Sequence, residues 1–288
     1  NFTRNTGNVM NIERIMIWEL NNTVFHLNTG GNTVIGSYSS DVLIGMWTWN
    51  QVSFTNNTGN WYGAVSISDG VDGDLEWNMT DCSFVGNKAS IQGSAIHWYR
   101  ARVMRFYWER VDFTENQVAD QPITMVVENG GYSGTMKDVT FTGNEGNEEI
   151  LFYNPGGSSL SLTNVVFKSS NRAIIINNIN DGSNDIIKMA GCVFDGNQLA
   201  FEFQGAPRKL ALDIRDSQFH NSGLLTGAPA INLGVTALNW AMQNTSFKGN
   251  NGLNGGAIAI NIGDNYNALS SFSWNNTVFE DNQAGKTG

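Results

Sequence analysis

A phenylalanine followed three positions later by an asparagine recurs along the whole chain, and this repeat limits the possible folds more than any other feature. Two further copies, Phe167 and Phe219, have Ser170 and Ser222 in the asparagine position. From Phe25 to Phe279 the steps are 29, 30, 29, 28, 26, 27, 25, 28 and 32 residues. A period near 28 residues indicates one structural unit stacked many times. The nine complete pairs are Phe2/Asn5, Phe25/Asn28, Phe54/Asn57, Phe84/Asn87, Phe113/Asn116, Phe141/Asn144, Phe194/Asn197, Phe247/Asn250 and Phe279/Asn282.

The residues before each phenylalanine alternate between apolar and polar. With the phenylalanine as position 0, position −5 is apolar in all ten repeats that contain it, and position −7 is apolar in all but the repeat with Gly134. Position −6, between them, is mostly polar. This alternation predicts a strand with one buried face. Position −3 is mostly Asn, Asp or Gln, which predicts a bend, and position −2 is small or β-branched, which favours a second strand facing the same core.

A third short strand is expected after a glycine-rich stretch in each repeat. Three strands and three corners in about 28 residues make one coil of a parallel β-helix, with coils about 4.8 Å apart. Equivalent side chains should then form columns of phenylalanine on phenylalanine, asparagine on asparagine and Trp47 on Trp77. Linked asparagine amides would satisfy buried polar groups. The expected third strands are residues 64–67, 95–98, 123–127, 150–153, 173–176, 199–203, 230–233 and 257–260.

We therefore predict an all-β protein in which residues 1–288 form one continuous right-handed parallel β-helix of about ten coils, with three short strands per coil. Solenoids share one core, so length alone does not imply two domains. The chain starts within one repeat and stops within another, without polar caps at either end. We expect it to be a segment of a longer protein, or to meet other subunits at its ends.

Composition narrows the possible partners. The formal net charge is −10, and no basic footprint for nucleic acid dominates. An acidic surface also disfavours anionic membranes. No run of 18 apolar residues is present, so we expect no transmembrane helix. The 39 Asn and 32 Gly residues are suited to tight turns with left-handed backbone.

The repeated Phe-x-x-Asn motif, together with the Gly-Gly-Ala-Ile sequence at residues 255–258, resembles the passenger repeats of chlamydial polymorphic membrane proteins. Weaker copies of the second motif begin at Gly63 and Gly93. Through its first motif the resemblance covers essentially the whole chain. It implies a right-handed β-helix of the pectin-lyase-like type and a secreted, surface-displayed adhesin. The membrane barrel that anchors those relatives is not present in this sequence.

The cysteines and histidines do not form a predicted site. Cys82 and Cys192 occupy position −2 four coils apart, about 19 Å at 4.8 Å per coil, so we expect two free, buried thiols rather than a disulfide. His26 and His220 lie seven coils apart, each at an outward position, and cannot share a metal ion. His97 lies in a third strand, where a satisfied or surface histidine is expected.

Two clusters are candidates for ligand binding. Asp69, Asp72 and Asp74 crowd one turn and could ligate Ca²⁺, although an acidic solvated turn is the simpler interpretation. Arg105 and Tyr107 should point outward, with Glu76 beside Arg105 one coil earlier, as a surface ion pair or as part of a site for an acidic or sugar ligand. The candidate ligand patch consists of Arg100, Arg102, Arg105 and Tyr107.

N-glycosylation sequons occur at a frequency close to chance for this composition, but those that can be aligned fall at outward or corner positions. They begin at Asn1, Asn21, Asn56, Asn78, Asn244 and Asn275.

The sequence favours a non-catalytic extracellular or cell-surface rod without cofactors, acting as an adhesin passenger or as the structural subunit of a surface fibre. The partners would be a host or cell-surface protein or glycan, or copies of the chain end to end. The variable turns after the third strands, residues 68–74, 154–157, 177–185 and 263–267, are the expected recognition loops. The alternative is a carbohydrate-binding or polysaccharide-cleaving β-helix, although an Asp-Asp pair and a Gly-His-Gly motif are missing. An ice-binding face would need a uniform outward threonine column, and position −6 is too mixed.

Overall fold

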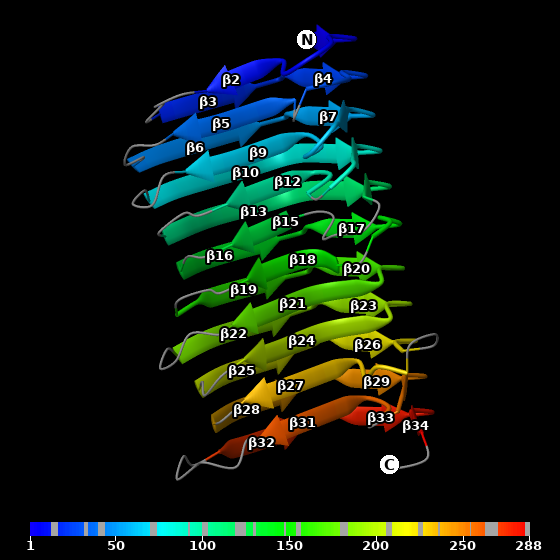
Figure 1. The fold of residues 1–288 in the computed structure, drawn as a ribbon. Helices are drawn as coiled ribbons and strands as arrows, with labels where there is room; N and C mark the ends of the chain where they lie inside the picture. Colours follow the sequence, from blue (N-terminus) through cyan, green and yellow to red (C-terminus); the bar gives the residue numbers. More distant parts are fainter. Residues whose placement is uncertain are drawn as a thin grey trace.

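The computed structural model describes most of the chain as a stack of β-coils, with the two termini at opposite ends of the stack (Figure 1). All its described elements are strands, and all the described strand pairings are parallel. The described residues are 1–12, 17–31, 34–39, 44–69, 74–91, 93–99, 103–118, 125–128, 131–146, 148–153, 157–178, 184–205, 209–223, 227–235, 237–253, 255–262 and 270–285.

The first side of each coil is the predicted strand around positions −7 and −5. It belongs to a 19-stranded sheet. Its strands are β3 (Ile17–Asn21), β6 (Ile44–Asn50), β10 (Asp74–Val85), β13 (Val103–Thr114), β16 (Gly131–Lys137), β19 (Ser159–Thr163), β22 (Asn184–Ala190), β25 (Lys209–Arg215), β28 (Ala237–Gln243) and β32 (Ser271–Asn275).

The second side carries the phenylalanine and continues the same sheet beyond a bend. The last residues of β10 and β13 contribute to it directly, because these two strands run through the bend. The other strands are β1 (Phe2–Thr3), β4 (Val24–His26), β7 (Ser53–Thr55), β17 (Thr140–Thr142), β20 (Val166–Lys168), β23 (Val193–Asp195), β26 (Gln218–His220), β29 (Ser246–Lys248) and β33 (Val278–Glu280).

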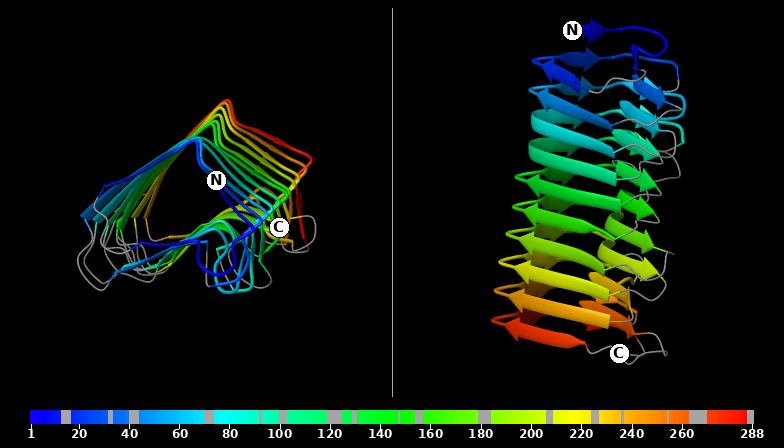
Figure 2. Two further views of the ribbon diagram at one scale, coloured as in Figure 1. Left: turned by 90° about the horizontal axis from the view of Figure 1, so that it is seen from above. Right: turned by 90° about the vertical axis from the view of Figure 1, so that its left-hand side faces the viewer.

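The third side is a ten-stranded sheet, and all the expected third strands are found in it. Seen along the axis, the sides of successive coils superpose (Figure 2). Its strands are β2 (Met10–Ile12), β5 (Ile35–Ser39), β9 (Val65–Asp69), β12 (Ile96–Tyr99), β15 (Met125–Glu128), β18 (Glu148–Tyr153), β21 (Arg172–Asn178), β24 (Leu199–Gly205), β27 (Ile231–Val235) and β31 (Ile258–Ile262). Short strands directly after position +3 form two small sheets. One consists of β8 (Thr58–Gly59), β11 (Lys88–Ala89) and β14 (Gln117–Val118), and the other of β30 (Asn251–Gly252) and β34 (Gln283–Ala284). The predicted all-β parallel solenoid with about 28 residues per coil is therefore confirmed.

Left-handed backbone makes two of the corners. Position −3 has a positive φ, between 49° and 65°, in all ten described repeats that contain it, which explains its Asn, Asp and Gln residues. Position +2 behaves in the same way, with φ between 52° and 67°. Side chains tolerant of this geometry predominate, but Leu27 and Arg110 adopt it too. The position +2 residues are Arg4, Leu27, Asn56, Gly86, Glu115, Gly143, Ser169, Gly196, Asn221, Gly249 and Asp281.

The phenylalanines form an unbroken column through the core, as predicted. Successive rings from Phe2 to Phe279 stack with centroids 4.6–5.0 Å apart and planes within 3–10° of parallel. Trp47 and Trp77 are also register partners, but their rings meet edge to face at 74°. Gly134, the exception at position −7, is explained by its neighbour. A Cβ on Gly134 would lie 1.9 Å from Phe106 Cζ, so the Phe106 ring fills that place in the core.

The asparagines at position +3 form a hydrogen-bonded ladder inside the second corner. Asn57 is typical, because its backbone N–H and its Nδ2 both donate to Asn87 Oδ1, at 3.1 and 3.0 Å. Its Nδ2 also donates to the carbonyl of Phe25, at 3.0 Å. The same links join Asn28 to Asn57, Asn87 to Asn116 and Asn116 to Asn144. The predicted amide ladder is therefore present in this part of the chain.

Candidate functional site

The outward side chains of the first side form an accessible surface, which we call the long face. On its strands buried and solvent-facing residues alternate, as in β22, where Ile186 and Lys188 face outward and Ile187 is buried. The backbone hydrogen bonds of this side run between coils, so its shape follows from which side chains the sequence places at positions −8, −6 and −4. Polar and small residues dominate there.

Arg105 and Tyr107 project from β13 onto the long face, on either side of the buried Phe106. Glu76 is the register partner of Arg105, as predicted. The ion pair, however, joins Arg105 to Asp74, with 3.9 Å between Nη1 and Oδ2. Glu76 instead accepts a hydrogen bond from Asn78 Nδ2 at 3.1 Å. The predicted outward placement is confirmed, and Arg105 reaches a carboxylate two residues away from the expected one.

A hollow of about 320 Å³ lies beside Tyr107, a residue that is 48% exposed. Polar side chains surround the ring, so the hollow combines one aromatic surface with hydrogen-bonding groups. This combination suits a sugar ring. The outward residues that line it are Asn78, Thr80, Tyr107, Glu109, Thr135 and Lys137.

Ion pairs hold one edge of this hollow in place. Glu109 Oε1 lies 2.8 Å from both Lys137 Nζ and Arg110 Nη1, and Arg110 Nε lies 2.6 Å from Asp81 Oδ1. These bonds hold the pKa values of Asp81 and Glu109 below their ordinary ranges and raise those of Arg110 and Lys137. All four groups are exposed, so their contribution to stability is small. Their effect is to position Glu109 and Lys137 beside Tyr107.

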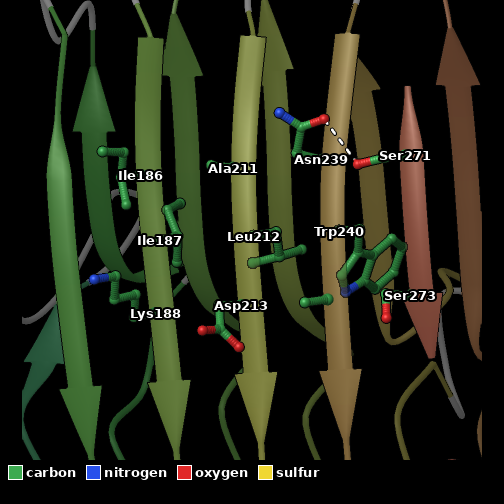
Figure 3. Close-up of a pocket in the computed structure, with 11 residues that line it drawn as sticks. Ile186, Ile187, Lys188, Ala211, Leu212, Asp213, Asn239, Trp240, Ser271 and Ser273 are labelled. Atoms are coloured by element: carbon green, nitrogen blue, oxygen red, sulfur yellow. Dashed lines mark hydrogen bonds between the residues drawn. The ribbon is translucent and has the colours of Figure 1, made fainter. Parts of the chain in front are cut away.

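A second hollow, of about 240 Å³, lies further along the long face between β22 and β32 (Figure 3). Its floor is lined by the small side chains of Ala211 and Ala241. On its upper side in the view, Ser271 Oγ donates to Asn239 Oδ1 at 3.0 Å. Asp213 is held by two hydrogen bonds from Arg215, each 2.9 Å long. This hollow exposes more apolar and less polar surface than the one at Tyr107.

Part of the predicted ligand and calcium sites lies outside the described residues. Arg100, Arg102 and Asp72 fall there, as does the side chain of Asp69. Asp74 is described and lies beside Arg105. Across the described part of the chain, no three His, Cys, Asp or Glu side chains form a group that could hold a metal ion. Of the candidate patch, the structure therefore brings together Arg105 and Tyr107.

His97 is buried in β12, next to Ser66 of β9. Its Nδ1 lies 3.3 Å from Ser66 Oγ, and the Tyr62 ring stacks on it with centroids 3.9 Å apart. Burial lowers the pKa of His97 to about 3, so the ring is neutral at physiological pH. A serine next to a neutral histidine resembles a nucleophile and its base, but a substrate cannot reach two buried side chains. This pair is part of the packing, as the sequence predicted for His97.

The remaining histidines and the cysteines agree with expectation. His26 and His220 are partly exposed, and His220 Nε2 lies 3.0 Å from Ser246 Oγ. Cys82 and Cys192 are free and buried. Burial raises the pKa of each thiol to about 11, so both are protonated and unreactive at neutral pH.

The candidate glycosylation sites differ in accessibility. Asn21, Asn56 and Asn275 are exposed. Asn244 is exposed as well, but its Nδ2 donates to Asp216 and its Oδ1 accepts from Asn276. Asn78 is only partly exposed and donates to Glu76. A glycan on Asn78 or Asn244 would replace one hydrogen of the same Nδ2 that donates these bonds.

Sequence reasoning missed the buried acid Glu149, the second residue of β18. Its carboxylate accepts hydrogen bonds from Asn144 Nδ2, at 3.2 and 3.0 Å, and from Ser170 Oγ. It therefore supplies oxygen atoms where the asparagine ladder is interrupted by Ser170. The available signal was a charged residue directly before the apolar run that starts at Ile150.

Comparisons of the chain with protein families, with curated proteins and with solved structures found no match. The class that the geometry defines is a parallel β-solenoid. No described helix is long and apolar enough to cross a membrane.

Proposed function

We propose that this chain is a non-catalytic extracellular or cell-surface rod, an adhesin passenger or a structural segment of a surface fibre. The single observation that supports this proposal best is the phenylalanine column, which continues from Phe2 to Phe279 without interruption. A chain that uses its patterned positions for stacking gains length and stiffness, which a spacer or a display scaffold requires. The resemblance to polymorphic membrane protein passengers points to the same role.

The test of this proposal is the location of the chain in its own organism. Antibodies raised against the purified chain should label intact cells as strongly as permeabilised cells, and external protease should remove the label. Labelling only after permeabilisation would contradict a surface role. Binding of the purified chain to host cells or to isolated surface material would then distinguish an adhesin from a purely structural rod.

The second candidate is a carbohydrate-binding β-helix, and the Tyr107 hollow favours it. The exposed Tyr107, with Asn78, Thr135 and the Glu109–Lys137 ion pair lining the same hollow, offers both stacking and hydrogen bonds to a sugar. Arg105 on the same strand could pair with an acidic group of the ligand.

A glycan array with two matched double variants tests this candidate. The pair Arg105→Ala/Tyr107→Ala alters the proposed site. The pair Ser159→Ala/Ser161→Ala alters the same two positions two coils further along, on β19. Binding that is lost in the first variant and kept in the second would support the site. Equal binding by the native chain and the first variant would contradict it, and an absence of any binding would favour the rod alone.

A further inference from the structure

The second interruption of the asparagine ladder differs from the first. Ser222 occupies the ladder position between Asn197 and Asn250, and it is fully buried. Its backbone N–H donates to Asn250 Oδ1 at 2.9 Å, so the ladder resumes on its C-terminal side. Its hydroxyl oxygen has no hydrogen-bond partner among the described residues. A buried polar atom of this kind requires an explanation.

Asn197, one coil earlier, has lost the acceptor that an intact ladder provides. Elsewhere in the ladder the backbone N–H and Nδ2 of an asparagine both donate to the carboxamide oxygen of the next coil, as from Asn57 to Asn87. Ser222 has no such oxygen. Within the described part of the chain, Asn197 keeps only the bond from Nδ2 to the Phe167 carbonyl, at 3.1 Å, and the bond that its Oδ1 accepts from Ser170 N–H, at 3.0 Å.

Three polar groups are thus left at one buried place: the backbone N–H of Asn197, the second Nδ2 hydrogen of Asn197 and the hydroxyl of Ser222. Asn197 and Ser222 face each other, because Phe194 and Phe219 are register partners and Gly223 N–H donates to the Asn197 carbonyl at 3.1 Å. The carboxamide oxygen that serine lacks is close in size to a water molecule. Polar sites of this size with two to four hydrogen-bonding groups hold buried water in proteins.

We propose that Asn197 and Ser222 form a binding site for one buried water molecule, which takes the place of the missing carboxamide oxygen. The water accepts hydrogen bonds from the Asn197 N–H and Nδ2 and donates one to Ser222 Oγ. A halide ion would also fit three donors. It would, however, be buried without a cation, in a chain of net charge −10, and would need full desolvation.

Three measurements on the intact chain test this site. A high-resolution crystal structure should show one ordered water within hydrogen-bond distance of Asn197 N, Asn197 Nδ2 and Ser222 Oγ. In solution, the Asn197 side-chain amide protons should show magnetisation transfer from a long-lived water. A crystal soaked in sodium bromide should give no anomalous peak at this position.

Two variants sharpen the test. Ser222→Asn should expel the water, place Oδ1 at its position and abolish the water contact of Asn197. Asn57→Ser should create an equivalent water site beside Asn28, in a part of the ladder that has none of these unmet groups. The proposal would be overturned by an empty site, by an Asn197 side chain turned toward another acceptor, or by a bromide peak. The three measurements on the native chain test the proposal even if neither variant folds.

Discussion

The N-terminal and C-terminal halves of the stack differ in the hydrogen bonds that stabilise the corner at position +3. From Asn5 to Asn144 the ladder is continuous, and each asparagine donates hydrogen bonds to the asparagine of the next coil. From Asn144 onward it is interrupted at Ser170, where Glu149 intervenes, and at Ser222, where no other described side chain does. The phenylalanine column is continuous in both halves. The repeat therefore tolerates interruptions of its polar ladder, with a replacement carboxylate at Ser170 and without one from a described side chain at Ser222, whereas its apolar column is uninterrupted.

Low pH should produce the largest difference in stability between the two halves, because His97 lies in the N-terminal half. The folded chain keeps His97 neutral down to a pKa of about 3, whereas an unfolded histidine takes up a proton near pH 6.5. Protonation therefore favours the unfolded state, and stability falls as the pH drops from about 6.5 toward 3. The loss is about 1.4 kcal/mol per pH unit over that window.

Urea unfolding at several pH values, with hydrogen exchange to locate the opening, measures this effect. Amides near β9 and β12 should lose protection before those near β25 and β28. In His97→Asn the extra loss between pH 6 and 4 should disappear, leaving only the contribution of the carboxylates. Identical pH profiles for the native chain and the variant would show that His97 is not held neutral.

The next largest effect is expected at Ser170, the first interruption. Glu149→Ala removes the oxygens that replace a ladder carboxamide there. Asn144 Nδ2 and Ser170 Oγ would lose a buried partner, and each unmet group costs about 1–3 kcal/mol. We expect a loss of about 3 kcal/mol in the free energy of unfolding. The double variant Glu149→Ala/Ser170→Asn should recover much of it by restoring a normal ladder residue. Thermal melts compare the three chains. An unchanged melting temperature for Glu149→Ala would contradict the idea that the Glu149 carboxylate replaces a ladder carboxamide oxygen.

Asn87→Ser introduces a serine, like those at positions 170 and 222, into the continuous part of the ladder. It removes the acceptor for Asn57 and the donor to the Phe54 carbonyl and to Asn116. The register of the third sheet places Ala64, in the coil of Asn57, at the position of Glu149, so no carboxylate there could replace the lost oxygen. We expect a loss of about 2 kcal/mol. Urea denaturation measures it, and a value close to zero would mean that the ladder contributes little to stability.

Much of the fold could be predicted because stacking repeats the same residue at the same place. The period of Phe and Asn, the alternation at positions −7, −6 and −5 and the left-handed residues at position −3 all follow from one coil being placed on another. Even the exception at Gly134 is local, since the ring of Phe106 from the coil before fills its place. Each of these features depends only on register.

The parts that could not be predicted depend on contacts that do not repeat. Glu149 reaches Ser170 across 21 residues, and which oxygen fills an interruption depends on the course of the chain after one corner. The sequence left open whether His97 is buried or at the surface, and the structure shows it buried, with the Tyr62 ring stacked on it. Arg105 pairs with Asp74 rather than Glu76, because a long side chain can select either of two carboxylates on the neighbouring strand. Tyr107 could be found from the sequence because it lies at an outward position beside the arginine cluster.

The smallest expected effect is the repair of the second interruption by Ser222→Asn. An asparagine there would give Asn197 the acceptor it lacks and would carry the ladder on to Asn250, at the cost of ordering one more side chain. The native chain already meets part of this need if a water is bound there, so we expect a gain of only about 1 kcal/mol. Ser170→Asn is the matched control, because Glu149 already fills that place and a second oxygen source would crowd it. A stabilised Ser222→Asn beside a neutral or destabilised Ser170→Asn would show that the two interruptions differ in what occupies them. Equal effects would show that the serine itself, rather than its surroundings, decides how each corner is held.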